Sequence, residues 1–209
     1  MALTPKVDGW TIVIAGFWNR MIFSPEWLQA HGILPEGQML AAELPADLSG
    51  PPRLSFDGIR MTVDPRRLIL GTDAILDDRL RRMEEVAVTI LSQLSHTPIK
   101  GVGINFQWTD NDPPGEVLNC FNVADGARLG DAGLEIRETQ IVRKIADGER
   151  VINLSLTLSD DHSIVFQFNF HGEVTSALAA GNFLKDRVLT SRSRATEILR
   201  TVYHEEAAL

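Results

Sequence analysis

Two consecutive segments in the C-terminal third alternate apolar and polar residues so regularly that both faces of each segment can be assigned. Residues 152–158 carry Ile or Leu at every even position, and residues 164–170 carry Ile or Phe at every even position. Strict alternation predicts half-buried strands, and the polar segment 159–163 between them predicts the turn of a β-hairpin.

The pairing of the two strands follows from the same pattern, because a shift of one residue would move every side chain to the opposite face. For the two apolar sets to share a face, Leu156 must lie opposite Phe166, and Asn153 must lie opposite Asn169. That pairing requires a loop with an odd number of residues, centred on Asp161.

The other face of this hairpin is polar but almost free of charge. It carries Asn153, Ser155, Thr157, Gln167, Asn169 and His171. A sheet face that only meets solvent usually holds charged residues, since these are the residue types least often buried. We therefore expect this face to be either covered by another element or used for binding.

Segments rich in β-branched and aromatic residues predict further strands. Trp10–Phe17 is apolar on both parities, which is typical of a strand buried on both faces or placed near the centre of a sheet. Asp57-Gly58 predicts a two-residue hairpin turn. Gly101 and Gly103, inside a strand predicted at 99–108, indicate a bulge or the close approach of another backbone. The remaining predicted strands are Met39–Leu44, Arg53–Phe56, Ile59–Val63, Leu68–Leu70 and residues 134–146.

Three regions have the signals of helices. Apolar residues at three- and four-residue spacing over 76–95 predict the longest helix. Ser24 is a typical N-cap for a short helix over Pro25–His31. One or two closing helices are expected after Thr175, with a break near Ser191. A weak or irregular helix is expected at 116–123.

The order of strands followed by a helix occurs twice along the chain. It predicts an α+β fold with antiparallel sheet built from two meander-then-helix halves and with the helices packed on one side. We expect a single domain over residues 1–209, with structural halves 1–109 and 110–209. A doubly wound nucleotide-binding fold is disfavoured, because strands and helices do not alternate singly.

Charge and composition limit the partners. The chain has 20 Lys and Arg against 28 Asp and Glu, a net charge of −8. Because binding to nucleic acid depends on clustered cations, we expect no nucleic-acid partner. The arginine clusters at 79–82 and 187–194 are interpreted as solvated helix faces.

No apolar run approaches the roughly 20 residues of a membrane span, and the single cysteine excludes an internal disulfide. No membrane partner and a cytoplasmic location are expected.

The sequence contains no recognisable catalytic arrangement. Five histidines are scattered without the spacing of metal ligands, and the single Cys120 lies among apolar residues. No glycine-rich phosphate loop is present. We therefore expect no metal, no cofactor and no catalytic residue, with His171 the only plausible general base.

A second cluster of interest lies at residues 17–23, where Trp18, Asn19 and Arg20 stand between hydrophobic residues. Such polar groups either cap backbone inside the fold or form an exposed patch in which Trp and Arg bind a partner. The predicted binding surface combines both clusters and consists of Asn153, Ser155, Gln167, Asn169, His171, Trp18, Asn19 and Arg20.

Short segments of the first half resemble small bacterial proteins. The resemblance covers residues 18–19, 23–28, 96–99 and 101–106. No activity is attached to this pattern, so the resemblance implies no function, cofactor or site.

We expect a non-enzymatic protein-binding or assembly component of a cytoplasmic complex, with self-association as one form of it. The basis is the uncharged polar sheet face together with the missing catalytic arrangement. The alternative is a small-ligand binder or enzyme with a pocket on the polar face of the 151–171 hairpin.

Overall fold

The structure is a computed structural model, which describes residues 3–44, 50–148, 150–205 and 207. The elements of the first part are β1 Thr4–Pro5, η1 Val7–Gly9, β2 Thr11–Gly16, η2 Arg20–Ile22, α1 Pro25–Ala30, β3 Ala41–Glu43, β4 Arg53–Phe56, β5 Ile59–Asp64, β6 Arg67–Thr72 and α2 Asp77–Gln93. Those of the second part are β7 Ile99–Asp110, α3 Gly115–Leu118, η3 Asn119–Phe121, α4 Gly126–Asp131, β8 Glu138–Asp147, β9 Arg150–Ser159, β10 Ile164–Gly172, α5 Ala177–Leu184 and α6 Val188–Val202.

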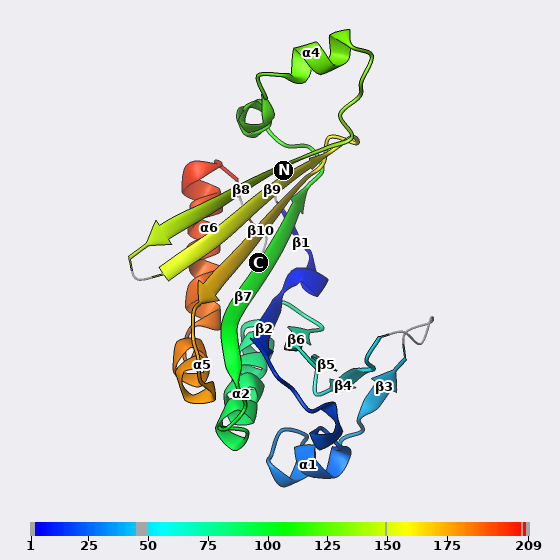
Figure 1. The fold of residues 1–209 in the computed structure, drawn as a ribbon, viewed down its shortest axis with the longest axis vertical. Coiled ribbons are helices and arrows are strands. Elements are labelled where there is room, and N and C mark those ends of the chain that lie inside the picture. Colours follow the sequence, from blue (N-terminus) through cyan, green and yellow to red (C-terminus); the bar gives the residue numbers. More distant parts are fainter. Residues whose placement is uncertain (1–2, 45–49, 149, 206, 208–209) are drawn as a thin grey trace.

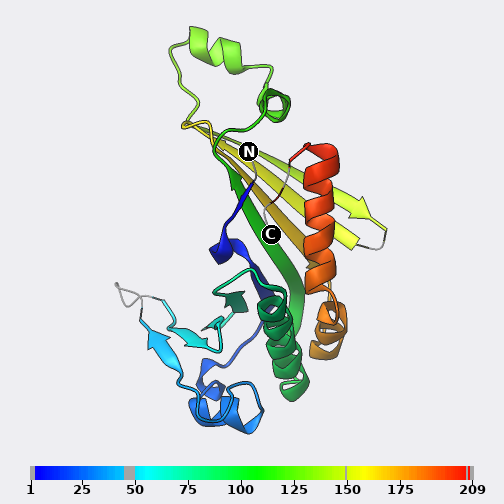
Figure 2. The same cartoon turned by 180° about the vertical axis from the view of Figure 1, so that it is seen from behind.

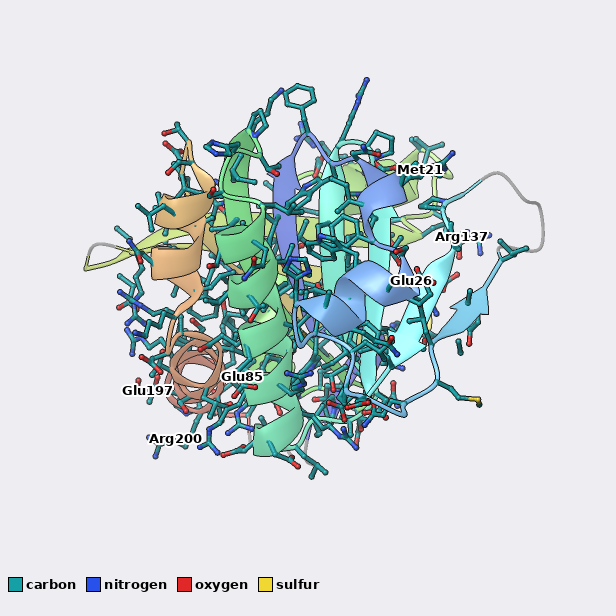
Figure 3. The ribbon with its side chains drawn as sticks, turned by 90° about the horizontal axis from the view of Figure 1, so that it is seen from below. Met21, Glu26, Glu85, Arg137, Glu197 and Arg200 are labelled. Atoms are coloured by element: carbon teal, nitrogen blue, oxygen red, sulfur yellow. The ribbon has the colours of Figure 1, made fainter. Side chains whose placement is uncertain are left out.

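The strands of the described residues form one ten-stranded antiparallel sheet in the order β3-β4-β5-β6-β2-β7-β10-β9-β8, with β1 paired to β7. Helices α2, α5 and α6 lie against one face (Figures 1 and 2). Helix α1 lies on the same side as α2 (Figure 3), and its Leu28 belongs to the same buried core. The predicted α+β fold with antiparallel sheet is confirmed.

The strand order contains the same topology twice. In each unit a first strand, β2 or β7, is followed by a connection and then by a three-strand meander, β4-β5-β6 or β8-β9-β10. The last strand of each meander returns beside the first strand of its own unit, and a long helix, α2 or α6, follows after it. Strands β2 and β7 pair with each other, so the two units share one sheet.

The predicted hairpin register is confirmed. Leu156 lies opposite Phe166, and Asn153 lies opposite Asn169. The loop between the two strands has an odd number of residues and is centred on Asp161, as predicted. His162 in this loop adopts a positive φ of 65°. The even positions of both strands point toward the helices, where Phe166 and Phe168 are almost completely buried.

The other predicted strands and the helices over 25–31 and 76–95 are also present. Trp10–Phe17 contains β2, which lies near the centre of the sheet but is fully buried on only one face. The register of β2 against β7 shifts between Ala15 and Gly16, opposite Gly101, so the expected bulge is found. Helix α4 was not expected from the sequence, and Figure 1 shows it projecting beyond the ends of β8, β9 and β10.

The predicted break near Ser191 is wrong, because Ser191 is buried inside α6. The two closing helices separate before Val188 instead. The Glu84 carboxylate of α2 accepts hydrogen bonds from the backbone N–H groups of Asp186, Arg187 and Val188, at 2.7, 3.1 and 2.8 Å. Glu84 thus caps the start of α6 from another helix, because Val188 is the first residue of α6 and Arg187 is its N-cap, and no local pattern reveals such a cap.

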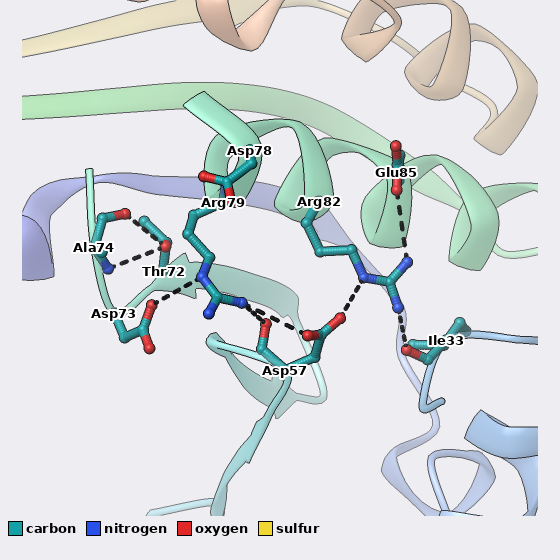
Figure 4. Close-up of polar contacts among 9 residues, drawn as sticks. All are labelled: Ile33, Asp57, Thr72, Asp73, Ala74, Asp78, Arg79, Arg82 and Glu85. Carbon is teal, nitrogen blue, oxygen red and sulfur yellow. Dashed lines mark hydrogen bonds and ion pairs between the residues drawn. The ribbon is translucent and has the colours of Figure 1, made fainter. Parts of the chain in front are cut away.

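Two of the three arginines of α2, Arg79 and Arg82, contact other parts of the fold, contrary to the prediction of a solvated face, whereas Arg81 is exposed as predicted. The Arg82 Nε atom lies 2.9 Å from an oxygen of Asp57, and Arg82 also donates to the carbonyl of Ile33 at 2.7 Å. Arg79 donates to the Asp57 carbonyl at 2.8 Å (Figure 4). These contacts join α2 to the β4–β5 turn and to the segment after α1. In the other predicted cluster, Arg192 pairs with Asp77 at 2.7 Å.

None of the described helices is both long enough and apolar enough to cross a membrane.

Candidate functional site

The polar side chains of the hairpin lie on the sheet face opposite α2, α5 and α6. Asn153, Ser155, Asn169 and His171 are half-buried and Gln167 is exposed. Within the described part of the chain no helix packs over them, and only η1 lies at the side of this face, where Gly9 contacts Gln107. The described chain therefore does not cover the face that the sequence singled out.

Three asparagines on neighbouring strands bind one another across this face. The side-chain amide of Asn153 donates to the Oδ1 atom of Asn169 at 3.0 Å, and the side-chain amide of Asn169 donates to the Oδ1 atom of Asn105 at 2.7 Å. Asn105 in turn donates to the hydroxyl of Thr11 at 3.1 Å. We call this row, which crosses β9, β10, β7 and β2, the amide ladder. Its members use part of their hydrogen-bonding capacity on each other, which stabilises uncharged polar side chains on this face.

Gly103 provides the space that the amide ladder needs. A Cβ atom at this position would lie 2.4 Å from the Nδ2 atom of Asn169. No side chain larger than hydrogen fits there without displacing the asparagine. The close approach that the glycines predicted is thus made by a side chain, not by a second backbone.

A shallow hollow of about 360 Å³ lies over the amide ladder. Asn153, Ser155, Gln167 and Asn169 of the predicted surface line it, whereas His171 does not. Its lining residues, which also include Gly9, Thr11, Asn105, Phe106, Gln107, Val142 and Phe168, contain no ionisable side chain. No group in the hollow can therefore donate or accept a proton near neutral pH.

Trp18, Asn19 and Arg20 do not join the hairpin residues. Trp18 is buried and its indole N–H donates to the carbonyl of Ile14 at 3.0 Å. Asn19 accepts from the backbone N–H of Met21 at 3.1 Å and so caps η2, while Arg20 is exposed. The structure thus shows the backbone-capping role for two of them. Trp18 and Asn19 line a separate hollow with residues 93–98, at the opposite end of β2 from the amide ladder.

The border of the sheet at β8 is a further surface that sequence analysis missed. Strand β8 is ten residues long and pairs with β9 on one side. No strand of the described residues pairs with its other side (Figure 1). In the first unit the corresponding strand β4 is flanked by β3. The sequence predicted a strand here, but a position at the border depends on the pairing of all the other strands.

A cleft of about 470 Å³ lies between α6 and the ends of β8 and β9. Ile152 and Leu154, both fully buried, line it together with Val117. Arg143 of β8 also lines the cleft and donates to the Tyr203 hydroxyl at 3.2 Å. Tyr203 is buried, which raises the pKa of its phenol.

The second arginine of the cleft, Arg194, is already paired. It donates to both oxygens of Asp147, at 3.0 and 2.8 Å, and to Glu197 at 2.7 Å. The hydrogen bonds from Arg194 lower the pKa of Asp147. By contrast, Arg143 forms no ion pair with any residue that the structure describes.

The fold and these surfaces define an α+β protein whose antiparallel sheet is packed by helices on one side, with a polar face and a border at β8 that the described part of the chain leaves open. Among the described residues there is no group of three or more His, Cys, Asp or Glu placed to hold a metal ion. No protein-family model matches the chain, and comparison with curated proteins finds no match.

Proposed function

We propose that this protein is a non-enzymatic assembly component that self-associates by pairing the β8 strands of two copies. The observation that carries the proposal is the open border of β8. An unpaired strand offers a row of backbone N–H and C=O groups, and adding a strand there is a common mode of protein association.

The hydrogen bonds within the amide ladder favour the border at β8, and not the polar face, as the surface for self-association. The ladder asparagines are hydrogen-bonded to one another, so part of the hydrogen-bonding capacity of this face is already used within the chain. Along β8, in contrast, the Val142 side chain is 65% exposed and lies beside the hollow on the polar face. β8 contains no proline, the residue that often blocks association at a sheet border.

The charges of β8 fit one antiparallel register. In a two-fold pairing centred on Ile141, Glu138 of each copy lies opposite the partner's Lys144 on the polar face. Opposite charges at facing positions stabilise a strand pair, whereas like charges destabilise it. A pairing centred on Arg143 would place two guanidinium groups opposite each other. Of these two registers, the charge pattern favours the first, which also places two opposite-charge pairs at facing positions.

This two-fold axis is perpendicular to the sheet and gives an isologous dimer. The two sheets become continuous, the helices of both copies lie on the same side, and the two polar faces form one surface. The border strand of each copy then becomes an interior strand, as β4 is in the first unit.

The proposal is tested by exchanging the two charges of β8. Glu138 and Lys144 are exposed and form no ion pair within the described chain. Lys144→Glu and Glu138→Lys should each weaken the dimer about tenfold, because each creates two like-charge pairs. The double variant restores both pairs and should regain wild-type association. Sedimentation equilibrium gives the dissociation constants.

Lys100→Glu is the matched control, since Lys100 is also an exposed strand lysine but lies on β7, separated from β8 by two strands. Its dimer should match the wild type. A wild-type protein that stays monomeric at high concentration, or a double variant as weak as the single ones, would show that the proposal is wrong.

The alternative, a small-ligand binder or enzyme on the polar face, has the hollow over the amide ladder in its favour. The uncharged lining of that hollow suits a neutral polar molecule and supplies no general acid or base. We therefore place binding of a neutral ligand there second to self-association, and catalysis after both.

A further inference from the structure

We infer that the cleft between α6 and the β8–β9 strands is a binding site for a monocarboxylate with an apolar tail, anchored by Arg143. This inference does not require the pairing of β8 strands, because it uses the side chains of β8 that face α6, whereas the pairing uses the free backbone groups of β8 and the side chains on its polar face.

The size and lining of the cleft fit a small amphipathic molecule. Its volume of about 470 Å³ lies within the usual range of ligand pockets, roughly 300–1,000 Å³. Ile145 of β8 and Val202 of α6 give the cleft its accessible apolar surface, and the buried side chains of Ile152 and Leu154 lie beneath it. Val202 is 60% exposed, so an apolar surface on the helix remains free for a ligand to cover.

Arg143 supplies the positive charge that would bind the carboxylate of such a molecule. Arg143 is half-buried as a residue, and among the described residues its guanidinium has the neutral hydroxyl of Tyr203 as its hydrogen-bond partner. A half-buried cation with a neutral partner is incompletely satisfied, and the planar guanidinium matches a carboxylate through two parallel hydrogen bonds.

The other charged groups of the cleft do not compete for the same role. Arg194 and Asp147 neutralise each other at 2.8 Å. Glu116 and His204 are exposed and lie at the rim. The guanidinium of Arg143 therefore lies beside apolar side chains. This arrangement favours a molecule that carries one negative charge and a hydrocarbon chain.

The inference is tested with decanoate, at concentrations below those at which it forms micelles, and isothermal titration calorimetry. We expect saturable binding of one decanoate per chain. Decanol has the tail without the charge, and acetate has the charge without the tail. Both should bind at least tenfold more weakly than decanoate. Decanol binding as tightly as decanoate, or no saturable decanoate binding, would overturn the inference.

Arg143→Gln should weaken decanoate binding at least tenfold, and Arg143→Lys should fall between the wild type and the Gln variant, because lysine keeps the charge but loses the forked geometry. Arg137→Gln is the matched control, since Arg137 is exposed and lies outside the cleft. Wild-type affinity in Arg143→Gln would overturn the role of Arg143. Far-UV circular dichroism establishes that each variant is folded.

Cys120 provides a second readout on the unsubstituted protein. It is half-buried, lines the cleft, and is the single cysteine of the chain. Decanoate should slow its modification by a bulky thiol reagent at least tenfold, and decanol should not. An unchanged rate under saturating decanoate would place the ligand outside the cleft. Glu138→Lys, which addresses the border of β8, should retain this protection, so the two proposals can fail separately.

Discussion

Glu205 is a buried carboxyl group with little compensation. It is 3% exposed, and its Oε1 atom has no hydrogen-bond partner among the described residues. Burial, together with the neighbouring carboxyl group of Asp110, raises the pKa of Glu205 to about 7. The folded protein therefore holds a proton that the unfolded chain releases near pH 4.5.

This raised pKa makes stability fall as the pH rises. The contribution of the protonated Glu205 is fully present below about pH 4.5, decreases between pH 4.5 and 7, and is lost above pH 7. Glu205→Gln keeps the neutral form at every pH. At pH 8 we expect it to be more stable than the wild type by on the order of 3 kcal/mol, and at pH 4 to be equal to it. Urea unfolding at several pH values measures the difference.

Glu173→Gln removes an exposed carboxyl group and should follow the wild-type pH profile. If Glu205→Gln loses stability between pH 4.5 and 7 as steeply as the wild type, the group responsible is not Glu205.

At the scale of single elements, β7 combines an unusual length with two glycines whose roles differ. Gly101 lies at the bulge opposite β2, and Gly103 leaves room for Asn169. The amide ladder depends on this second glycine, because it crosses β7 at Asn105, two residues further along the same face.

Gly103→Ala should therefore lower the free energy of unfolding by about 1–3 kcal/mol, since the new methyl group must displace Asn169. Thermal and denaturant unfolding measure this loss. Gly181→Ala is the matched control, because Gly181 lies inside α5 with no atom within 4 Å of an added Cβ. It should raise stability by roughly 0.5–1 kcal/mol. If both substitutions changed the free energy of unfolding by the same amount, the amide ladder would not depend on Gly103.

At the scale of the whole molecule, the two units of equal topology meet where β2 pairs with β7. Aromatic residues fix this junction. Trp10, just before β2, packs edge-to-face against Phe106 and Trp108 on β7, with ring centroids 5.1 Å apart in each pair. The indole N–H of Trp10 also donates to the Gln107 carbonyl at 3.0 Å.

Because this junction is shared, we predict that the chain unfolds in one cooperative transition. Trp10→Ala should lower the free energy of unfolding by about 3–5 kcal/mol. Tryptophan fluorescence and far-UV circular dichroism should report the same midpoint in the wild type and in the variant. Two separate transitions, with amide protection kept in one unit after the other has unfolded, would instead show independently folding halves.

Local patterns determined most elements of this fold. The alternation over residues 151–171 specified the hairpin, its register and its buried face, because side chains two residues apart share a face in any strand. The Asp57-Gly58 turn and the Ser24 cap are equally local, and both were predicted correctly. Such features depend on residues a few positions apart, so the sequence displays them directly.

Only the tertiary structure decided that the polar face of the sheet and its border at β8 are left open by the described part of the chain. The amide ladder joins Asn105 to Asn169 and to Thr11, 64 and 94 positions away in the chain. The cap of α6 by Glu84, the border position of β8 and the position of Arg143 beside Tyr203 also join distant segments. Residues so far apart become neighbours only when the strand order is fixed, and that order depends on the packing of the whole core.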